Sequence, residues 1–156
     1  IYSQQHDLLY THAYDIFQQN IIFGVGPKMF REECKLMKYN SFNQKDRVGI
    51  NKELCNTHPH NYVLQLLAET GILGTIPYII LFLTILYFFI NQFTYLYFKN
   101  KTFLDDTSIF LLCGVMMGIW PFFPTGNFFN NWLNFILFLN IGLLLGFLKN
   151  QKKLID

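Results

Sequence analysis

The chain has 156 residues, of which 52% are hydrophobic, 19% are aromatic and only 14% are charged. Ordinary soluble domains carry about 25% charged residues. The high hydrophobic and aromatic content excludes a disordered or collagen-like chain. The formal net charge is only +2, which excludes a nucleic-acid-binding domain with a strongly basic surface and indicates no polyanionic partner.

The charges are unevenly distributed along the chain. Residues 1–59 contain 13 of them, residues 62–98 contain only Glu69, and residues 107–148 contain none. A water-soluble fold cannot leave that much apolar sequence without a surface, whereas a bilayer accepts spans of about 20 mostly apolar residues. We therefore expect an all-α membrane protein, with a helical loop region over residues 1–59 and a membrane region over residues 60–156.

The loop region begins with a predicted helix over residues 4–20, in which apolar side chains recur at the helical period. Gly24 and Gly26 then allow a tight turn, and Pro27 suits the first position of a second helix. A dinucleotide-binding loop would need a third glycine where Met29 stands. We therefore expect a turn between two helices, with structural roles for both glycines.

Two of the three cysteines, Cys34 and Cys55, lie in the loop region and are separated by 20 residues. Outside the cytoplasm such a pair can oxidise. A bridge closing a loop of this size contributes roughly 3 kcal/mol in the chain-entropy model. The alternative is two unpaired thiols.

The stretch that follows leads into the first long apolar segment. Thr57 can cap a helix there, with Pro59 in its first turn. On that helix one face would hold His60, Leu64, Leu67, Gly71 and Gly74. His60 would then lie at the membrane–water boundary, above two glycines that let another helix or a lipid chain approach closely. Glu69 is the only charge in this segment, and a carboxylate near the apolar boundary needs a partner.

The pair His58 and His60 has three interpretations. The first is a capping role at the start of the helix. The second is a zinc site completed by His6 or His12, although these two are six residues apart and share no helix face, and no Asp or Cys supplies a further ligand. The third is a general base at a lipid–water interface, because an imidazole titrates near the operating pH and can accept a proton from an attacking hydroxyl.

Three segments of the membrane region are long and apolar enough to be read as spans, at residues 71–98, 107–123 and 132–148. For any one of them the alternative is a buried core helix. The short connections carry lysines after the first and third spans, which indicates cytoplasmic ends there. These lysines are Lys99, Lys101, Lys149, Lys152 and Lys153.

That orientation places residues 1–59 and the turn at 124–131 outside the cytoplasm. A region that begins outside needs a signal sequence or an earlier span to carry it across, and none is present. The first residue is Ile rather than Met. We therefore expect this chain to be the C-terminal part of a longer, polytopic membrane protein.

Two stretches, GVGPKMFREEC and CNTHPHNYVLQLLAETGILG, are followed by a long hydrophobic span, and together they resemble the O-antigen ligase and polymerase superfamily. The resemblance includes His60-Asn61, nine further residues, and then Gly71-x-x-Gly74, which is the spacing that marks the ligases. It covers residues 1 to about 98, and the last two spans match only in being hydrophobic. Full-length members have about a dozen spans.

The resemblance implies a metal-independent glycosyltransferase of the O-antigen ligase type, without a cofactor, in the bacterial inner membrane with its active-site loop facing the periplasm. It would transfer a glycan from an undecaprenyl pyrophosphate carrier to a hydroxyl of the lipid A core, in lipopolysaccharide biosynthesis. An O-antigen polymerase, which uses another repeat unit as acceptor, is one alternative. A non-enzymatic membrane module, such as a transporter of lipid-linked glycans or a scaffold subunit, is another.

The resemblance also implies roles for individual residues. His60 would be the base that activates the acceptor hydroxyl. Arg31, which follows the glycine turn, would hold the departing pyrophosphate by charge-assisted hydrogen bonds. This chain has His6 where many relatives carry Arg, and an imidazole binds phosphate less well at neutral pH than a guanidinium that stays charged. The residues expected to bind substrate are Arg31, Lys28, His58, Asn61, Glu69 and His6.

Overall fold

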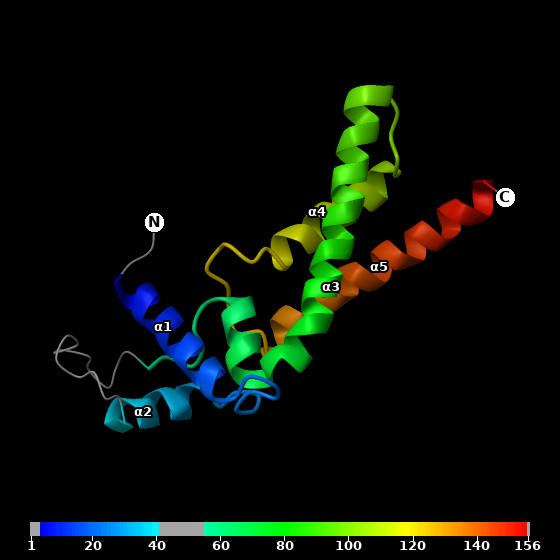
Figure 1. Ribbon diagram of the computed structural model, residues 1–156. Helices are drawn as coiled ribbons and strands as arrows, with labels where there is room; N and C mark the ends of the chain where they lie inside the picture. Colours follow the sequence, from blue (N-terminus) through cyan, green and yellow to red (C-terminus); the bar gives the residue numbers. More distant parts are fainter. Residues whose placement is uncertain (1–3, 41–54, 156) are drawn as a thin grey trace. The chain divides into compact units, whose positions relative to one another are not determined.

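The computed structural model describes residues 4–40 and 55–155, and within these ranges it contains five α-helices and no strand. The helices are α1 (Gln4–Gln19), α2 (Phe30–Asn40), α3 (Tyr62–Lys99), α4 (Asp106–Gly118) and α5 (Asn131–Ile155), as Figure 1 shows. The expected all-α class is confirmed.

The chain divides into two compact units. The first, here called the head unit, comprises Ile1–Pro77 and Pro121–Asn130. The second, here called the apolar unit, comprises Tyr78–Trp120 and Asn131–Asp156. The long helix α3 contributes to both units.

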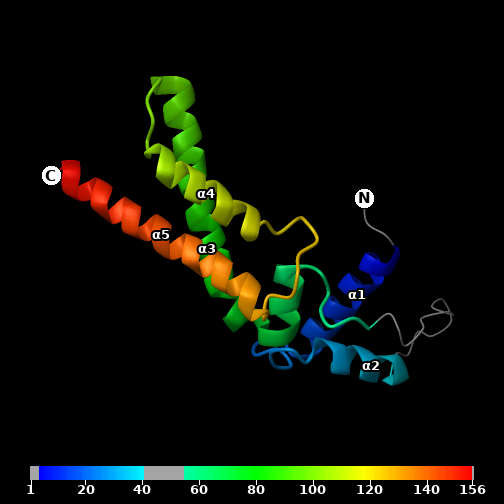
Figure 2. The ribbon, with the colours of Figure 1, turned by 180° about the vertical axis from the view of Figure 1, so that it is seen from behind.

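In the head unit α1 and α2 pack together and are joined by residues 20–29, here called the glycine turn (Figure 2). Their buried apolar side chains recur every three or four residues, which places them on one face of each helix. The core consists of Leu9, Ala13, Ile16, Phe30, Cys34, Cys55 and Ala68. A disulfide joins the two buried cysteines of this core, whose Cα atoms are 5.8 Å apart. The bridge ties α2 to the segment that leads into the His58–His60 turn.

Helix α3 begins at Tyr62, and its N-cap residue is Asn61. The Asn61 side-chain oxygen accepts a hydrogen bond from the N–H of Leu64 at 3.0 Å, which is the usual geometry of an N-cap. The expected cap at Thr57 is therefore wrong. His60 lies outside the helix with a φ of 57°, a left-handed conformation that cannot continue into an α-helix.

Within α3 the helix breaks at Gly71, where φ is 64° and ψ is −164°. The N–H of Ile72 donates to the carbonyl of Ile21 at 2.9 Å, and the N–H of Leu73 donates to the carbonyl of Ile22 at 3.3 Å. In an unbroken helix both groups would bond to carbonyls four residues earlier. Carbonyls of the glycine turn have therefore replaced carbonyls of α3 as the acceptors of these two N–H groups.

The carbonyls released by this break are also satisfied by the turn. Ala68 accepts from the N–H of Val25 at 3.1 Å, and Glu69 accepts from the N–H of Gly26 at 2.8 Å. Four backbone hydrogen bonds thus hold the turn inside the break in α3. Each of these four α3 backbone groups therefore has a hydrogen-bond partner.

Glycine is required at two of these positions because the backbones approach so closely. A Cβ at Gly24 would collide with the backbone of α3, and a Cβ at Gly71 would collide with the backbone of the turn. Gly74 instead leaves room for the Thr70 side chain of its own helix. The prediction that His60 and the two later glycines share one helix face is therefore wrong, because the helix starts after His60 and breaks at Gly71.

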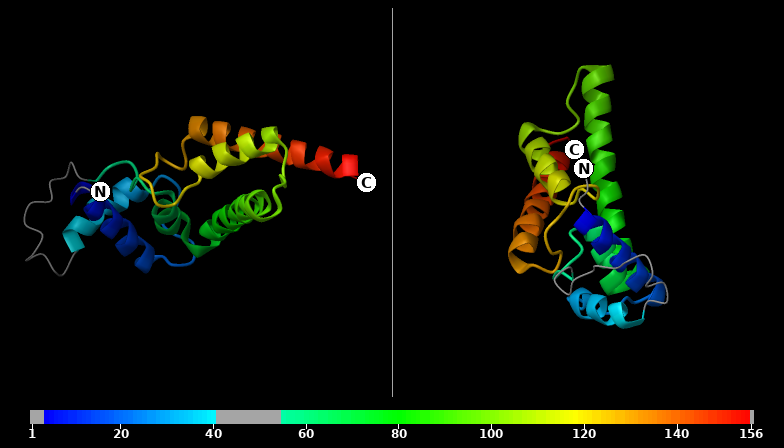
Figure 3. Two further views of the ribbon diagram at one scale, coloured as in Figure 1. Left: turned by 90° about the horizontal axis from the view of Figure 1, so that it is seen from above. Right: turned by 90° about the vertical axis from the view of Figure 1, so that its left-hand side faces the viewer.

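In the apolar unit α4 and α5 lie side by side (Figure 3). Two helical segments in the described ranges are long and apolar enough to cross a membrane, Tyr62–Lys99 and Asn131–Lys149. The predicted second span at 107–123 is wrong. Helix α4 has only 13 residues, so it is about 20 Å long, whereas the hydrocarbon core of a bilayer is about 30 Å thick.

The early end of α4 has a local cause. Ile119 caps the helix, and its carbonyl accepts a hydrogen bond from the Tyr78 hydroxyl at 2.6 Å. Two residues later Pro121 lacks the N–H that a continuing helix would need. The apolar composition continues past this point, but the helix cannot.

Candidate functional site

Three histidines of the head unit lie together and form what is here called the histidine cluster: His6 of α1, and His58 and His60 of the turn before α3. The ring centroids of His58 and His60 are 4.2 Å apart, and those of His6 and His60 are 5.6 Å apart. Three of the residues that are expected from the sequence to contact the substrate therefore lie close together in the structure.

The segment 121–130, although distant in sequence, holds the turn that carries His60. The N–H of Thr125 donates to the His60 carbonyl at 2.8 Å, and the Asn61 amide donates to the Pro121 carbonyl at 2.8 Å. Asn61 thus uses its oxygen as the cap of α3 and its nitrogen to bind this segment. In the structure its side chain positions the backbone beneath His60.

The side chains of the turn also contact the two histidine rings. The Asn56 amide nitrogen lies 2.8 Å from Nε2 of His60, and the Thr57 hydroxyl lies 2.9 Å from Nδ1 of His58. Asn56 is not among the site residues predicted from the sequence. Its position four residues before His60, in a turn rich in polar residues, is the only signal that could have indicated it.

Both histidines of the turn favour the neutral form. Burial lowers the pKa of His58 from 6.5 to about 4, and the nearby His60 adds to this effect. Burial also lowers the pKa of His60, and His6 adds to that, whereas the Thr125 backbone acts in the opposite direction. These shifts favour the uncharged rings, and a neutral imidazole can accept a proton without first losing one.

Glu69 is completely buried, and its carboxylate is bound by the protein itself. One oxygen accepts from the N–H of Phe30 at 2.9 Å, and the other accepts from the Gln65 amide at 3.0 Å. Because Phe30 is the first residue of α2, the carboxylate caps that helix at its positive end. Glu69 therefore joins α2 to α3.

Gln65 extends this buried polar network to the segment 121–130. Its amide nitrogen donates to the Asn127 side-chain oxygen at 2.9 Å, and its oxygen accepts from the N–H of Phe128 at 2.9 Å. Gln65 is not among the site residues predicted from the sequence. The signal was a glutamine one helical turn before Glu69, in a segment that is otherwise apolar.

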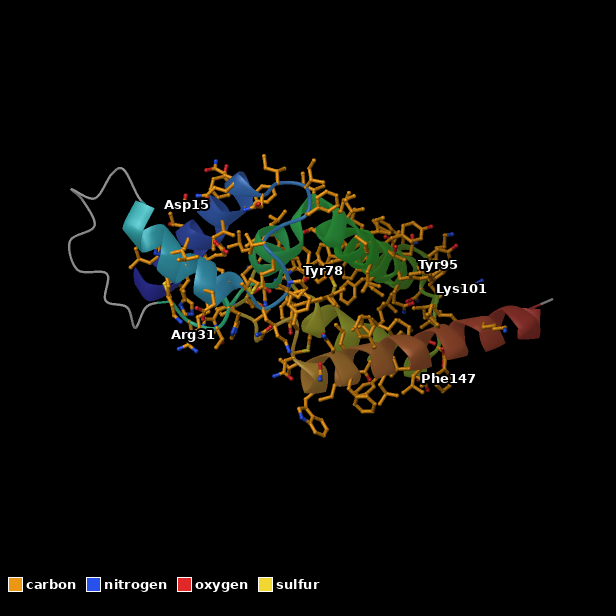
Figure 4. The ribbon with its side chains drawn as sticks, turned by 90° about the horizontal axis from the view of Figure 1, so that it is seen from below. Asp15, Arg31, Tyr78, Tyr95, Lys101 and Phe147 are labelled. Carbon is orange, nitrogen blue, oxygen red and sulfur yellow. A yellow bond between two sulfur atoms is a disulfide. The ribbon has the colours of Figure 1, made fainter. Side chains whose placement is uncertain are left out.

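Arg31 and Lys28 lie three residues apart at the start of α2, and both are exposed. Figure 4 shows the Arg31 side chain projecting outward from α2. Lys28 has a φ of 66°, which turns the chain from Pro27 into the helix. Within the described ranges the structure brings neither cation into contact with His60.

The zinc interpretation finds no ligand set in the part of the chain that the structure describes. No group of three or more His, Cys, Asp or Glu side chains is arranged there to hold a metal ion. The rings of the histidine cluster instead meet edge to face or at a tilt.

No curated protein and no solved structure matches the chain. Residues 7–79 match the family model described as O-antigen ligase, a segment that includes the glycine turn, the disulfide, His58, His60 and the break in α3. This match supports the resemblance drawn from the sequence, because residues 7–79 are similar to the O-antigen ligase family.

Proposed function

We propose that the protein is a membrane glycosyltransferase of the O-antigen ligase type. It transfers a glycan from undecaprenyl pyrophosphate to a hydroxyl of the lipid A core, at the periplasmic face of the bacterial inner membrane. The family match suggests an O-antigen ligase- or polymerase-type function. Two helices long and apolar enough to cross a membrane support a lipid-linked donor.

The observation that carries this proposal is the position of His60, whose ring contacts those of His6 and His58 in the histidine cluster. Burial and the neighbouring His6 lower its pKa, which favours the uncharged form of the ring. A base poised in this way accelerates attack by a hydroxyl by a factor of about 10² to 10⁴. His60 lies on a turn that the disulfide and segment 121–130 hold in place.

The reaction is an in-line displacement at the anomeric carbon of the donor sugar. The acceptor hydroxyl oxygen forms a bond to that carbon while His60 takes the hydroxyl proton. The bond between the carbon and the pyrophosphate oxygen breaks, and the electron pair leaves with undecaprenyl pyrophosphate. The configuration at the anomeric carbon is inverted.

The leaving pyrophosphate gains negative charge and needs cations. The first backbone N–H of α2 is bonded to the Glu69 carboxylate, so it is not free to bind a phosphate. The positive groups available at this end of α2 are the exposed side chains of Arg31 and Lys28. Arg31 remains charged at all relevant pH values and can bind two phosphate oxygens at once.

The proposal is tested with the purified protein in proteoliposomes, supplied with an undecaprenyl pyrophosphate-linked glycan and lipid A core. Mass spectrometry is expected to show glycan attached to the core. Lengthening of the donor glycan without added core would instead identify a polymerase. If folded protein forms neither product, that result would contradict the enzymatic proposal and favour a transport or scaffold module.

The role of Arg31 is tested by a matched pair of substitutions on one helix. Arg31→Ala is expected to lower the transfer rate by about 10²-fold, the usual effect of removing one donor to a developing negative charge. Lys35→Ala removes an exposed cation of α2 whose partner is Glu32, and it is expected to leave the rate unchanged. Equal rates for the two variants would remove Arg31 from the scheme.

A further inference from the structure

The orientation of the Asn56 amide is determined by the backbone next to it. The Asn56 side-chain oxygen accepts a hydrogen bond from the N–H of Thr57 at 2.8 Å. Rotating the amide by 180° would place its NH₂ group against that N–H and lose the bond. The nitrogen of the amide therefore faces His60, at 2.8 Å from Nε2.

This orientation determines which nitrogen of His60 carries the proton. The amide nitrogen of asparagine has hydrogens and no available lone pair, so it can only donate. Nε2 of His60 must then accept, and a nitrogen that accepts is unprotonated. Neutral His60 is therefore the tautomer with its proton on Nδ1 and its basic lone pair on Nε2.

A lone pair accepts one strong hydrogen bond at a time. The hydroxyl that gives its proton to Nε2 must therefore take the place that the Asn56 amide occupies. Asn56 is exposed, and as a side chain on an open turn it can rotate away when the acceptor arrives.

We propose that Asn56 is a positioning residue for the transfer reaction. Its amide fixes His60 in the tautomer that has its lone pair on Nε2. In the resting protein the amide occupies the position at Nε2 that the acceptor hydroxyl takes during the reaction. This inference rests on the proposed function, because it assumes that His60 is the base.

Two other titratable groups face the His60 ring. His6 approaches from α1 and His58 from the same turn, and both contact it through their rings. The segment 121–125 contributes a backbone group, at Thr125, but no charge. A carboxylate introduced at position 56 would therefore be the nearest negative charge to His60 among the groups named here.

The test is Asn56→Asp, which keeps the shape of the side chain but replaces the donor by an acceptor. The carboxylate favours a proton on Nε2 and stabilises the imidazolium, so it blocks the base and raises its pKa. We expect the transfer rate at pH 7 to fall about tenfold or more. We also expect the acidic limb of the pH–rate profile to move up by about one pH unit.

Three further variants make the result specific. Asn20→Asp places the same charge on the exposed turn after α1, and it is expected to leave rate and pH profile unchanged. Asn56→Gln keeps an amide donor and is expected to retain the wild-type acidic limb. Asn56→Ala lowers the rate less than Asn56→Asp and leaves the acidic limb in place, because it adds no charge.

The inference is overturned if Asn56→Asp keeps the wild-type rate and acidic limb, or if the Asp and Ala variants lose equal activity without a shift of that limb. The second result would mean that Asn56 merely stabilises the turn. If Asn56→Asp does not fold, a shifted acidic limb in Asn56→Gln would overturn the inference, and an unshifted one with partial activity would support it. Wild-type transfer by folded His60→Ala would contradict the proposed function itself, which separates the two failures.

Discussion

The head unit and the apolar unit are stabilised in different ways. In the head unit, hydrogen bonds of single buried side chains join segments that are far apart in sequence, as Glu69 does for α2 and Gln65 for Phe128. In the apolar unit, α4 and α5 pack through apolar side chains, and many large ones remain exposed, including Phe110, Met117 and Phe135.

This difference indicates which unit depends on individual residues. A membrane-facing helix needs an apolar surface, and many sequences provide one. A turn inserted into a helix needs particular glycines, a particular cap and particular carbonyls. Single substitutions should therefore matter much more in the head unit, and the same type of substitution can be compared in both units.

The largest effect is expected for Gly71→Ala. Alanine is strained at a φ of 64°, and its Cβ would collide with the Ile22 carbonyl, so the four-bond exchange between turn and helix would be lost. With each hydrogen bond contributing about 1 kcal/mol, we expect a loss of about 3–5 kcal/mol. Hydrogen exchange in peptides covering residues 20–26 and 66–73 would measure it.

The matched control is Gly142→Ala in α5, where a Cβ would meet nothing within 4 Å. Alanine in an open helix position is expected to stabilise by about 0.5–1 kcal/mol. If the two variants changed protection by similar amounts, the contrast between the units would be wrong.

The second largest effect is expected for the disulfide. Replacing Cys34 and Cys55 by serine removes a buried bridge and should cost roughly 3 kcal/mol in the chain-entropy model. Cys113, which is exposed on α4, serves as the control, and its replacement by serine should leave stability unchanged. Thermal unfolding of the three proteins would decide, and an unchanged midpoint for the double variant would argue against a structural bridge.

A smaller effect is expected for Glu69→Gln. The new amide can accept from Phe30 with its oxygen, but its nitrogen then faces the Gln65 amide, so a buried donor loses its acceptor. Such a group costs about 1–3 kcal/mol. Glu32→Gln breaks only an exposed pair with Lys35, which is worth about 0–1 kcal/mol. Equal midpoints of thermal unfolding for both variants would contradict the capping role of Glu69.

The smallest effect is expected on changing the pH. His58 and His60 have pKa values below 6.5 in the folded head unit, about 4 for His58, so the unfolded chain binds more protons between these values. The contribution of these histidines to the free energy of unfolding is therefore fully present above pH 6.5, and it declines as the pH falls toward 4. Thermal unfolding at pH 7.5 and 5 would show this decline, and His58→Gln should reduce it. A decline of the same size in that variant would exclude His58 as its source.

Local signals in the sequence predict much of the head unit. Gly24, Gly26 and Pro27 indicate the turn before α2, because the glycines allow a tight turn and proline suits the first position of a helix. The short spacing of His58 and His60, next to a polar turn, indicates the candidate site. Long apolar runs indicate the first and third spans, since composition and length suffice for them.

The remaining features depend on contacts between distant residues. The spacing of Gly71 and Gly74 fits a continuous helix that packs closely against a neighbour as well as a helix that breaks at Gly71. Only the contact with the turn around Ile22 distinguishes these two structures. The end of α4 depends on Tyr78, 41 residues before Ile119. The sequence shows that Glu69 needs a partner, but no local pattern reveals that this partner is the first N–H of α2.

The central claim is that His60 is the base of a glycan transfer reaction, and the most direct measurement is the transfer rate of His60→Ala in proteoliposomes. The account predicts a rate at least about 10²-fold below wild type, with hydrogen exchange of α1, α2 and the glycine turn unchanged. A folded His60→Ala protein that transfers glycan at the wild-type rate would contradict the account.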